Sequence, residues 1–176
     1  TTNDSYRKSI IFVYLNRHCF NGLCRYNKSG EFNTPVGDYK NPILPEEQLN
    51  YAKEKIKNFD IRSEDFRNIF KLAKSGDVIY CDPPYLPLSE SSSFVSYSKE
   101  GFSLQDHIDL AKCAYEASEK GAYVLISNHS NWYSLQIYTN MFNAKIKNFE
   151  VQRTISSKVE KRESVKELIA VFKGKV

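Results

Sequence analysis

Cysteine and histidine are few in this sequence, and long apolar runs are absent from it. The four cysteines form no Cys-x-x-Cys pair and the three histidines do not cluster with them, which argues against a zinc site and favours reduced thiols in a cytoplasmic protein. The longest apolar run extends from Ile10 to Leu15 and is far too short to cross a membrane. We therefore expect neither a metal ion nor a membrane span.

A large excess of charge of one sign is also missing. The 176 residues carry a net charge of +4, and 41% of them are hydrophobic, which indicates a globular chain with one core, or a core and a small lobe. The net charge is +2 over residues 1–60, −3 over residues 61–143 and +5 over residues 144–176. Basic ends suit a polyanionic partner, but charge alone favours an ordinary solvated surface.

Hydrophobic periodicity predicts helices in the first third of the chain and an α/β pattern in the rest. Between the two early helices, three glycines and three prolines break the pattern, so a structured loop region with room for a hairpin is expected. Strands separated by helices imply a parallel-dominated sheet that binds ligands at the C-terminal ends of its strands. The expected helices cover residues 5–18, with Ser5 as N-cap, 45–58 and 104–120, and the expected strands cover residues 77–81, 122–126, 145–151 and 167–172.

The helix expected at residues 104–120 has the clearest signals. Ser103 is placed to cap its start, and Gly121 is placed to end it. Apolar side chains recur at helical spacing and are expected to form its buried face. These side chains are Leu104, Ile108, Ala111 and Tyr115.

The motif that carries chemistry directly follows the strand expected at residues 77–81. It consists of Asp82, Pro83, Pro84 and Tyr85. Proline fixes φ and has no backbone N–H, so the carbonyls of this stiff turn are free to accept hydrogen bonds. The carboxylate of Asp82 and the carbonyl of Pro83 could each accept one N–H of an amine conjugated to a ring, localise its lone pair and orient it for attack on a sulfonium methyl group. Tyr85 could stack on an extruded base, or it could simply pack in the core behind a proline-rich turn.

This motif and the sequence around it resemble the Dam-type DNA adenine methyltransferase family. Residues 78–85 resemble the catalytic motif of that family, and residues 14–37 contain the blocks Tyr-Leu-Asn-Arg, Phe-Asn-Gly-Leu-Cys-Arg-Tyr-Asn and Gly-Glu-Phe-Asn-Thr-Pro-Val-Gly, which resemble its target-recognition segment. Further matches follow in the right order: Ser127, Asn128 and His129 after a strand, and residues 153–157 near the end. The resemblance covers nearly the whole chain.

The resemblance implies a fold and a function. The fold is a partial Rossmann-like methyltransferase sheet with a small, mainly helical target-recognition lobe. Residues 1–60 would be the target-recognition segment, and residues 61–176 would be a catalytic core that lacks its N-terminal strands. The implied function is transfer of a methyl group from S-adenosylmethionine to the exocyclic amine of an adenine flipped out of double-stranded DNA in a GATC-like site, in the cytoplasm at the nucleoid.

The resemblance also assigns residues to DNA. Phe20 would wedge into the gap left by the flipped base, and Arg25 is the first choice for reading guanine, because Arg is the strongest reader of that base in the major groove. Core packing is the alternative for Phe20 and Leu23. Asp38 stands where family members often carry a basic residue that helps to read or hold DNA. Either this contact with DNA is lost here, or Lys40 supplies it. The DNA-binding residues implied are Arg17, Phe20, Asn21, Leu23, Arg25, Asn27 and Lys40, of which Arg17 and Asn27 would position the block or touch phosphates.

Other positions are assigned to the cofactor and to the loop beyond the motif. Asp65 and Phe66 match an acidic–aromatic pair that holds the adenine of S-adenosylmethionine in related enzymes, with Asp82 beside the methyl donor. A helix N-terminal acid and a core Phe explain the pair equally well. Residues 86–97 would form a mobile loop that closes over the flipped base. His129 is expected to hydrogen-bond a loop and not to act as a base.

The family's glycine-rich cofactor loop is missing. No two of the seven glycines lie close enough to form a Gly-x-Gly pattern, and the family's N-terminal lysine motif is absent too. We therefore expect that a separate N-terminal portion or a second chain completes the methionine pocket. Three functions stay open: an adenine methyltransferase, an amino-cytosine methyltransferase with a similar turn, and a catalytically incomplete DNA-binding module.

Overall fold

The computed structural model of the chain describes residues 4–27, 29–40, 42–88, 101–152 and 164–174. The chain divides into two compact units, Thr1–Ile61 and Arg62–Val176. The loop at residues 86–97, which is expected to close over the flipped base, lies mostly outside the described residues. The matched motif at residues 153–157 also lies outside them.

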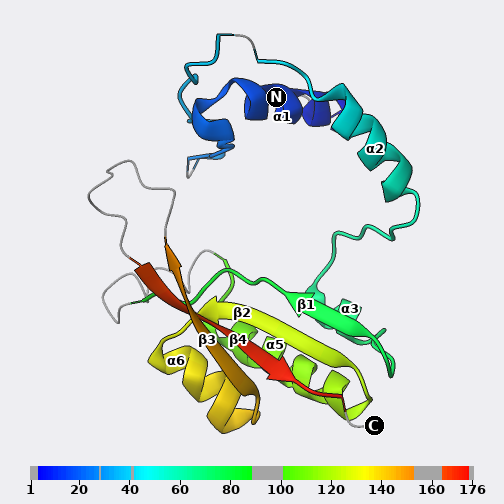
Figure 1. Cartoon of the computed structure of the whole chain (residues 1–176), viewed down its shortest axis with the longest axis vertical. Coiled ribbons are helices and arrows are strands. Elements are labelled where there is room, and N and C mark those ends of the chain that lie inside the picture. Colours follow the sequence, from blue (N-terminus) through cyan, green and yellow to red (C-terminus); the bar gives the residue numbers. More distant parts are fainter. Residues whose placement is uncertain (1–3, 28, 41, 89–100, 153–163, 175–176) are drawn as a thin grey trace. The chain divides into compact units, whose positions relative to one another are not determined.

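The first unit contains the two helices that periodicity predicts. Helix α1 covers Ser5–His18 and helix α2 covers Glu46–Ile56 (Figure 1). Ser5 is not the N-cap of α1, so that expectation is wrong. Asp4 has the extended backbone conformation of a cap, and its carboxylate accepts the Tyr6 N–H at 3.0 Å. A carboxylate at this position also favours the positive end of the helix dipole.

The loop region of the first unit is held by short antiparallel contacts. A single turn of 3-10 helix, Phe20–Gly22, follows α1. Isolated bridges then join Cys19 to Val36 and Tyr26 to Phe32, so the chain doubles back as the glycines and prolines suggest. Among the described residues of this unit, only Cys19 is buried. The unit therefore presents much of its apolar and aromatic surface to solvent.

The second unit contains a four-stranded mixed sheet. Its strands are β1 Val78–Cys81, β2 Tyr123–His129, β3 Lys145–Gln152 and β4 Ser164–Phe172, in the order β1-β2-β4-β3. Strand β1 runs parallel to β2, whereas β4 pairs antiparallel with both β2 and β3. The mixed α/β fold is confirmed, but the expectation of a parallel-dominated sheet is wrong in the described part of the chain. Only residues 153–163 separate β3 from β4, which is short for the crossover that a parallel pair needs.

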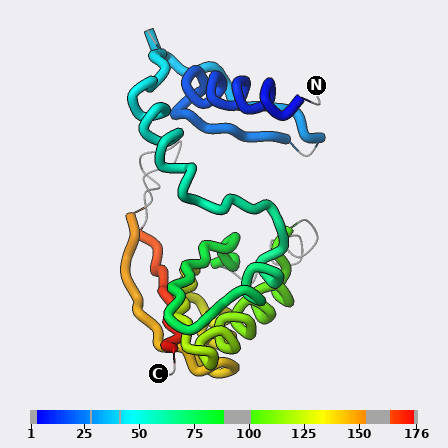
Figure 2. The backbone as a smooth tube through the Cα atoms, turned by 90° about the vertical axis from the view of Figure 1, so that its right-hand side faces the viewer, coloured from blue at the N-terminus to red at the C-terminus, as the bar shows by residue number. Residues whose placement is uncertain are grey.

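Helix α5, Leu104–Glu119, connects β1 to β2 and packs on one face of the sheet (Figures 1 and 2). Its start is fixed by a capping box in which Ser103 and Asp106 exchange hydrogen bonds, which confirms Ser103 as the cap. Its buried face differs from the expected one. Of the four side chains predicted there, only Ala111 is buried, and Tyr115 is exposed. Small side chains let the helix approach the sheet closely, and its buried positions are His107, Leu110, Ala111, Ala114, Ala117 and Ser118.

The two faces of the sheet are unequal. Val124 and Ile126 on β2 and Ala170 on β4 are buried on the face that α5 covers. On the other face, the side chains of Val78 and Tyr80 are 72% and 60% exposed. The described part of the unit also contains three short helical segments: α3 Phe66–Phe70, α6 Trp132–Leu135 and the π-helical η2 Gln136–Met141. No described helix has both the length and the apolar character that crossing a bilayer requires.

Candidate active site

The predicted catalytic turn leaves the C-terminal end of β1 beside the end of β2. Because the two strands are parallel and Cys81 pairs with Ile126, Asp82 lies next to Ser127. The Ser127 hydroxyl donates to Oδ1 of Asp82 at 2.9 Å and lies 3.2 Å from the carbonyl of Cys81. The carboxylate that follows the strand is therefore oriented by a side chain of the neighbouring strand.

The far side of the turn is anchored by side chains at the end of β2. Oδ1 of the buried Asn128 accepts the Leu86 N–H at 2.9 Å, and Nδ1 of His129 lies 2.8 Å from the Leu86 carbonyl. The amide of Asn131 donates to the carbonyl of Pro87 at 3.0 Å. The expected loop-bonding role of His129 is thus confirmed. Sequence reasoning missed Asn128 and Asn131 as anchors, because a buried amide cannot be distinguished from an exposed one by pattern alone.

Tyr85 sits between these anchors. Its ring contacts the ring of His129 edge to face, with centroids 5.0 Å apart, and it is only partly buried. Burial is the main cause that raises the pKa of the Tyr85 hydroxyl, and the hydrogen bond with Ser127 opposes it. The phenol is therefore neutral near pH 7, which suits a stacking surface better than a proton acceptor. Burial raises the pKa of the Cys81 thiol to about 12, so this thiol is protonated near pH 7.

A cavity of about 300 Å³ opens beside Asp82. Three of the predicted site residues line it, namely Phe66, Asp82 and Pro83, and most of the other side chains around it are apolar. Asp65 does not line the cavity, whereas the neighbouring Glu64 does. The sequence did not point to Glu64 or Phe102 as site residues. The side chains around the cavity are Glu64, Phe66, Ile69, Phe70, Ile79, Tyr80, Cys81, Asp82, Pro83, Phe102 and Leu110.

The acidic–aromatic pair is held by Arg67. Asp65 caps α3 by accepting the Arg67 N–H at 2.8 Å, and its carboxylate pairs with the guanidinium at 3.0 Å. The same guanidinium lies 4.4 Å from the centroid of the Phe66 ring. The helix-capping function that the sequence left open for Asp65 is present. Its assignment to the cofactor stays a prediction.

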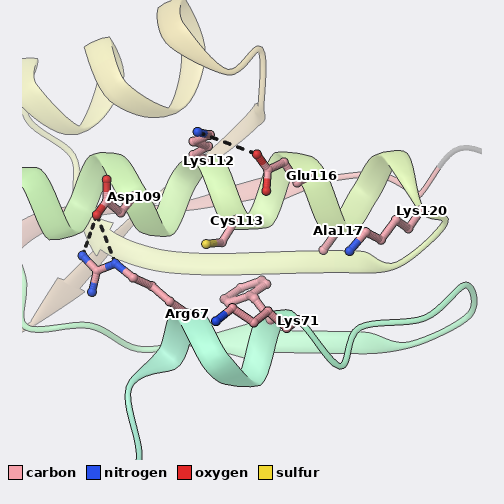
Figure 3. Close-up of a pocket in the computed structure, with 9 residues that line it drawn as sticks. Arg67, Lys71, Asp109, Lys112, Cys113, Glu116, Ala117 and Lys120 are labelled. Atoms are coloured by element: carbon pink, nitrogen blue, oxygen red, sulfur yellow. Dashed lines mark hydrogen bonds and ion pairs between the residues drawn. The ribbon is translucent and has the colours of Figure 1, made fainter.

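Arg67 also ties α3 to α5. Its guanidinium pairs with Asp106 at 2.5 Å and with Asp109 at 2.6 Å. The pKa of Asp106 falls to about 2, first because of Arg67 and next because of Ser103. A second cavity, of about 320 Å³, lies between the two helices, and Figure 3 shows Arg67 and Asp109 joined at one end of it and Lys120 at the other. This cluster fixes the position of Phe66 relative to α5.

His107 lies in the first turns of α5 with no exposed surface. Its ring packs edge to face on Phe102, with centroids 4.8 Å apart. Burial lowers the pKa of His107 to about 4, while the charge of Asp106 and the backbone of Pro84 act in the opposite direction. The folded protein therefore keeps the imidazole neutral, and sequence reasoning did not single it out.

This neutral histidine predicts a loss of stability in mild acid. The pKa of His107 is about 4 in the folded chain and 6.5 in a free side chain. As the pH falls below 6.5, the unfolded state therefore binds a proton at this side chain, whereas the folded state does not. We expect the free energy of unfolding to drop by about 2 kcal/mol between pH 7 and pH 5. Urea titrations at a series of pH values measure this drop. His107→Gln should flatten the curve in that range, and an unchanged slope would contradict the assignment.

In the first unit, the residues assigned to DNA lie mostly at the surface. Phe20 is 50% exposed, so core packing does not account for it within this unit, and Leu23 is exposed as well. Arg25 is held from behind, since its Nε donates to Oδ1 of Asn33 at 3.0 Å and its Nη2 to the Asn33 carbonyl at 3.2 Å. This arrangement presents a preorganised guanidinium at the surface.

The remaining residues of the predicted DNA-binding set have positions of different kinds. Arg17 donates to the carbonyl of Ile43 at 3.1 Å. Oδ1 of Asn27 accepts from two backbone N–H groups of the following turn, and its amide donates to Glu31. Asn21 and Lys40 are exposed, and Asn21 has a left-handed backbone with φ of 52°. Asp38, which stands where the resemblance expects a basic residue, is exposed as well. Arg17, which is itself exposed, and Asn27 thus make hydrogen bonds within the unit, and the contact of this set with DNA stays a prediction.

A mixed α/β unit with an anchored Asp-Pro-Pro-Tyr turn at its strand ends is consistent with a methyltransferase-like fold. A family model described as D12 class N6 adenine-specific DNA methyltransferase matches residues 1–155. The chain belongs to this family. Among the described residues, no group of three or more His, Cys, Asp or Glu side chains is placed to hold a metal ion.

Curated relatives are similar along almost the whole chain. A DNA adenine methylase of Serratia marcescens is 42% identical over 98% of the chain, and one of Haemophilus influenzae (strain ATCC 51907 / DSM 11121 / KW20 / Rd) is 44% identical over 97% of it. One of Escherichia coli (strain K12) is 40% identical over 98%. These matches cover 63%, 59% and 61% of the respective relatives. The chain thus spans about three-fifths of the length of the curated relatives it matches.

Proposed function

We propose that this chain contains the target-recognition segment and the catalytic turn of a DNA methyltransferase that methylates the exocyclic amine of adenine in a GATC-like site. The observation that carries the proposal is the turn itself. Asp82 is oriented by Ser127, the turn is anchored by Asn128 and His129, and the Tyr85 ring stays partly accessible. Family membership supports the same reaction. Such an enzyme acts on chromosomal DNA, so we place it in the cytoplasm at the nucleoid.

In the proposed reaction, the turn acts on the adenine amine. The Asp82 carboxylate and the Pro83 carbonyl each accept one N–H of the amine, which turns its lone pair toward the methyl donor. The same acceptors stabilise the positive charge that develops on nitrogen as the bond between sulfur and the methyl carbon breaks, so no base is needed before attack. The donor would leave as a neutral thioether, and the methylated amine would lose its extra proton after the transfer. Tyr85 supplies the face on which the flipped adenine stacks.

The proposed methyl donor is S-adenosylmethionine, which supplies an electrophilic methyl group on a sulfonium. The cavity beside Asp82 suits its adenosine end, because it combines the aromatic rings of Phe66 and Phe102 with carboxylates of Glu64 and Asp82. The aromatic rings would hold the adenine, and Asp82 would face the cationic end of the donor. In the proposal, an N-terminal portion or second chain provides the pocket for the methionine group.

Cofactor titration separates this proposal from a DNA-binding module without catalysis. Because the sequence has no glycine-rich loop, we expect the 176-residue chain alone to bind S-adenosylmethionine weakly or not at all in isothermal titration. Fusion to the N-terminal segment of a relative should restore binding and methylation of adenine. A micromolar dissociation constant for the chain alone would contradict the need for a second part. Methylation of cytosine by the fusion, with adenine unmodified, would favour an amino-cytosine methyltransferase.

Arg25 is expected to read one base of the target. Replacing Arg25 by Ala should weaken binding to a GATC duplex by roughly 1–3 kcal/mol and relax preference at one position, because a bidentate contact to guanine is lost. Fluorescence anisotropy with cognate and scrambled duplexes at several salt concentrations measures both effects. Arg25→Lys keeps the positive charge but loses the paired N–H donors of the guanidinium, so it should keep only nonspecific DNA binding. Asn33→Ala frees the guanidinium and should have a smaller effect. If Arg25→Ala binds the cognate and the scrambled duplex with the same affinities as the parent does, Arg25 does not read a base.

A further inference from the structure

The two oxygens of the Asp82 carboxylate have different surroundings. The side chain is exposed and lines the cavity of about 300 Å³. Oδ1 accepts the Ser127 hydroxyl at 2.9 Å, whereas Oδ2 has no hydrogen-bond partner among the described residues. One contact from the neighbouring strand therefore decides which oxygen is free to bind a substrate.

Ser127 is held more firmly than the carboxylate that it contacts. It is only 3% exposed, and it lies inside β2, where it pairs in register with Ile169 of β4. Ser127 is not among the residues that line the cavity, whereas Asp82 is. The hydroxyl therefore reaches the carboxylate from the protein interior and leaves its cavity side open.

The Ser127 hydroxyl has one proton and two acceptors within reach. The second acceptor is the Cys81 carbonyl, which lies 3.2 Å from the hydroxyl oxygen. Hydrogen bonds to a carboxylate are shorter and stronger than those to a neutral carbonyl, and the contact with Asp82 is the shorter of the two. The proton is therefore directed to Oδ1 of Asp82.

We propose that Ser127 is a positioning residue that occupies Oδ1 of Asp82 and so reserves Oδ2 for one N–H of the adenine amine. This inference rests on the proposed function for its consequence in catalysis, but not for the contact itself. It also makes the turn depend on an acid, because an amide has one acceptor oxygen and one NH2 group. In Asp82→Asn the amide oxygen would take the Ser127 proton, and the NH2 group would face the adenine amine, so that two donors meet.

The contact is tested on the 176-residue chain by NMR of the side-chain carboxyl carbons. Ser127→Ala removes the donor and should shift the resonance of the Asp82 carboxyl carbon. Ser130→Ala is the matched control, because the Ser130 hydroxyl donates to Asn148 at 2.9 Å and not to the turn; it should leave that resonance in place. The same Asp82 carboxyl shift in the parent and in Ser127→Ala would overturn the proposal.

The catalytic consequence is tested by a double-mutant cycle in the chain fused to the N-terminal segment of a relative. Ser127→Ala should lower the single-turnover methylation rate about 10- to 100-fold, because the free oxygen is no longer aimed at the amine. The dissociation constant for DNA should not change. In the Asp82→Asn background the effect should reverse. The double variant should methylate several-fold faster than Asp82→Asn alone, because the amide is free to turn its oxygen toward the amine.

The sign of this coupling separates positioning from a merely structural role. If Ser127 only supported the fold, its removal would lower the rate by the same factor in both backgrounds, and that result would overturn the proposal. Equal rates for the parent and Ser127→Ala would overturn it as well, whereas Ser130→Ala should keep the parental rate. If no version methylates DNA, the proposed function fails, while the carboxyl resonance still decides whether Ser127 holds Asp82.

Discussion

Replacing Asp82 by Asn is expected to lower the rate of adenine methylation by about two to three orders of magnitude, which is the usual effect of removing a preorganised group that stabilises developing charge. Asn keeps the shape and one acceptor, and it can still bond to Ser127, which holds Asp82 at 2.9 Å. It loses the negative charge that faces the cationic amine formed during transfer. The single-turnover rate with tritiated cofactor measures the effect, in the chain or in its fusion to a relative's N-terminal segment.

Variants of Tyr85 serve as controls for this prediction. Tyr85→Phe should be the mildest change, because the stacking face remains and only the hydroxyl is lost. Tyr85→Ala should be severe, since base stacking on an aromatic side chain is worth roughly 1–3 kcal/mol. DNA binding should stay largely intact in Asp82→Asn. If Tyr85→Phe were as damaging as Asp82→Asn, the phenol would have to act in proton transfer, and the mechanism proposed here would be wrong.

Replacing Asn128 by Ala is expected to lower the free energy of unfolding by roughly 3–4 kcal/mol, the sum of a buried donor left without its acceptor and a small cavity. The Asn128 side chain has no exposed surface. Its Oδ1 accepts the N–H groups of Leu86 and His129, and its Nδ2 donates to the Tyr138 hydroxyl at 3.1 Å. Urea unfolding followed by circular dichroism measures the loss.

Two further variants separate the network from a general effect of removing an amide. Asn148→Ala on β3 removes an exposed amide that accepts a hydrogen bond from Ser130. It should lower the free energy of unfolding by less than about 1 kcal/mol. Tyr138→Phe removes one partner of Asn128 and should cost about 1–2 kcal/mol. The double variant of Asn128 and Tyr138 should cost less than the sum of the single variants. A loss in Asn128→Ala no larger than that in Asn148→Ala would contradict the anchoring role.

Family membership and the position of the Asp-Pro-Pro-Tyr turn were predictable because both depend on local sequence. The order Asp-Pro-Pro-Tyr after an apolar strand needs no knowledge of packing, and β1 ends at Cys81, directly before it. Ser103 was predictable as a cap for the same reason, since a capping box spans only four residues. The strand at residues 122–126 and the helix at 104–120 followed from hydrophobic periodicity, and they appear as β2 and α5.

Side-chain burial was less predictable. The face of α5 expected from apolar spacing included Tyr115, which is exposed, and omitted His107, which is buried. Leu and Tyr can be accommodated at the edge of a helix interface, whereas alanines permit the close approach of α5 to the sheet. Which residues face the sheet is set by how near the two elements come, and spacing alone does not contain that distance.

By itself the sequence determined the mixed α/β class, the place of the Asp-Pro-Pro-Tyr turn after a strand and the likeness to adenine methyltransferases, because these reside in contiguous residues and in periodicity. Only the tertiary structure decided that β4 inserts antiparallel between β2 and β3, that Asn128 and His129 pin Leu86 from 42 and 43 residues away, and that Arg67 joins α3 to α5. These contacts form between segments distant along the chain. They exist only once the hydrophobic core has brought strand ends and helix faces together, so no local pattern encodes them.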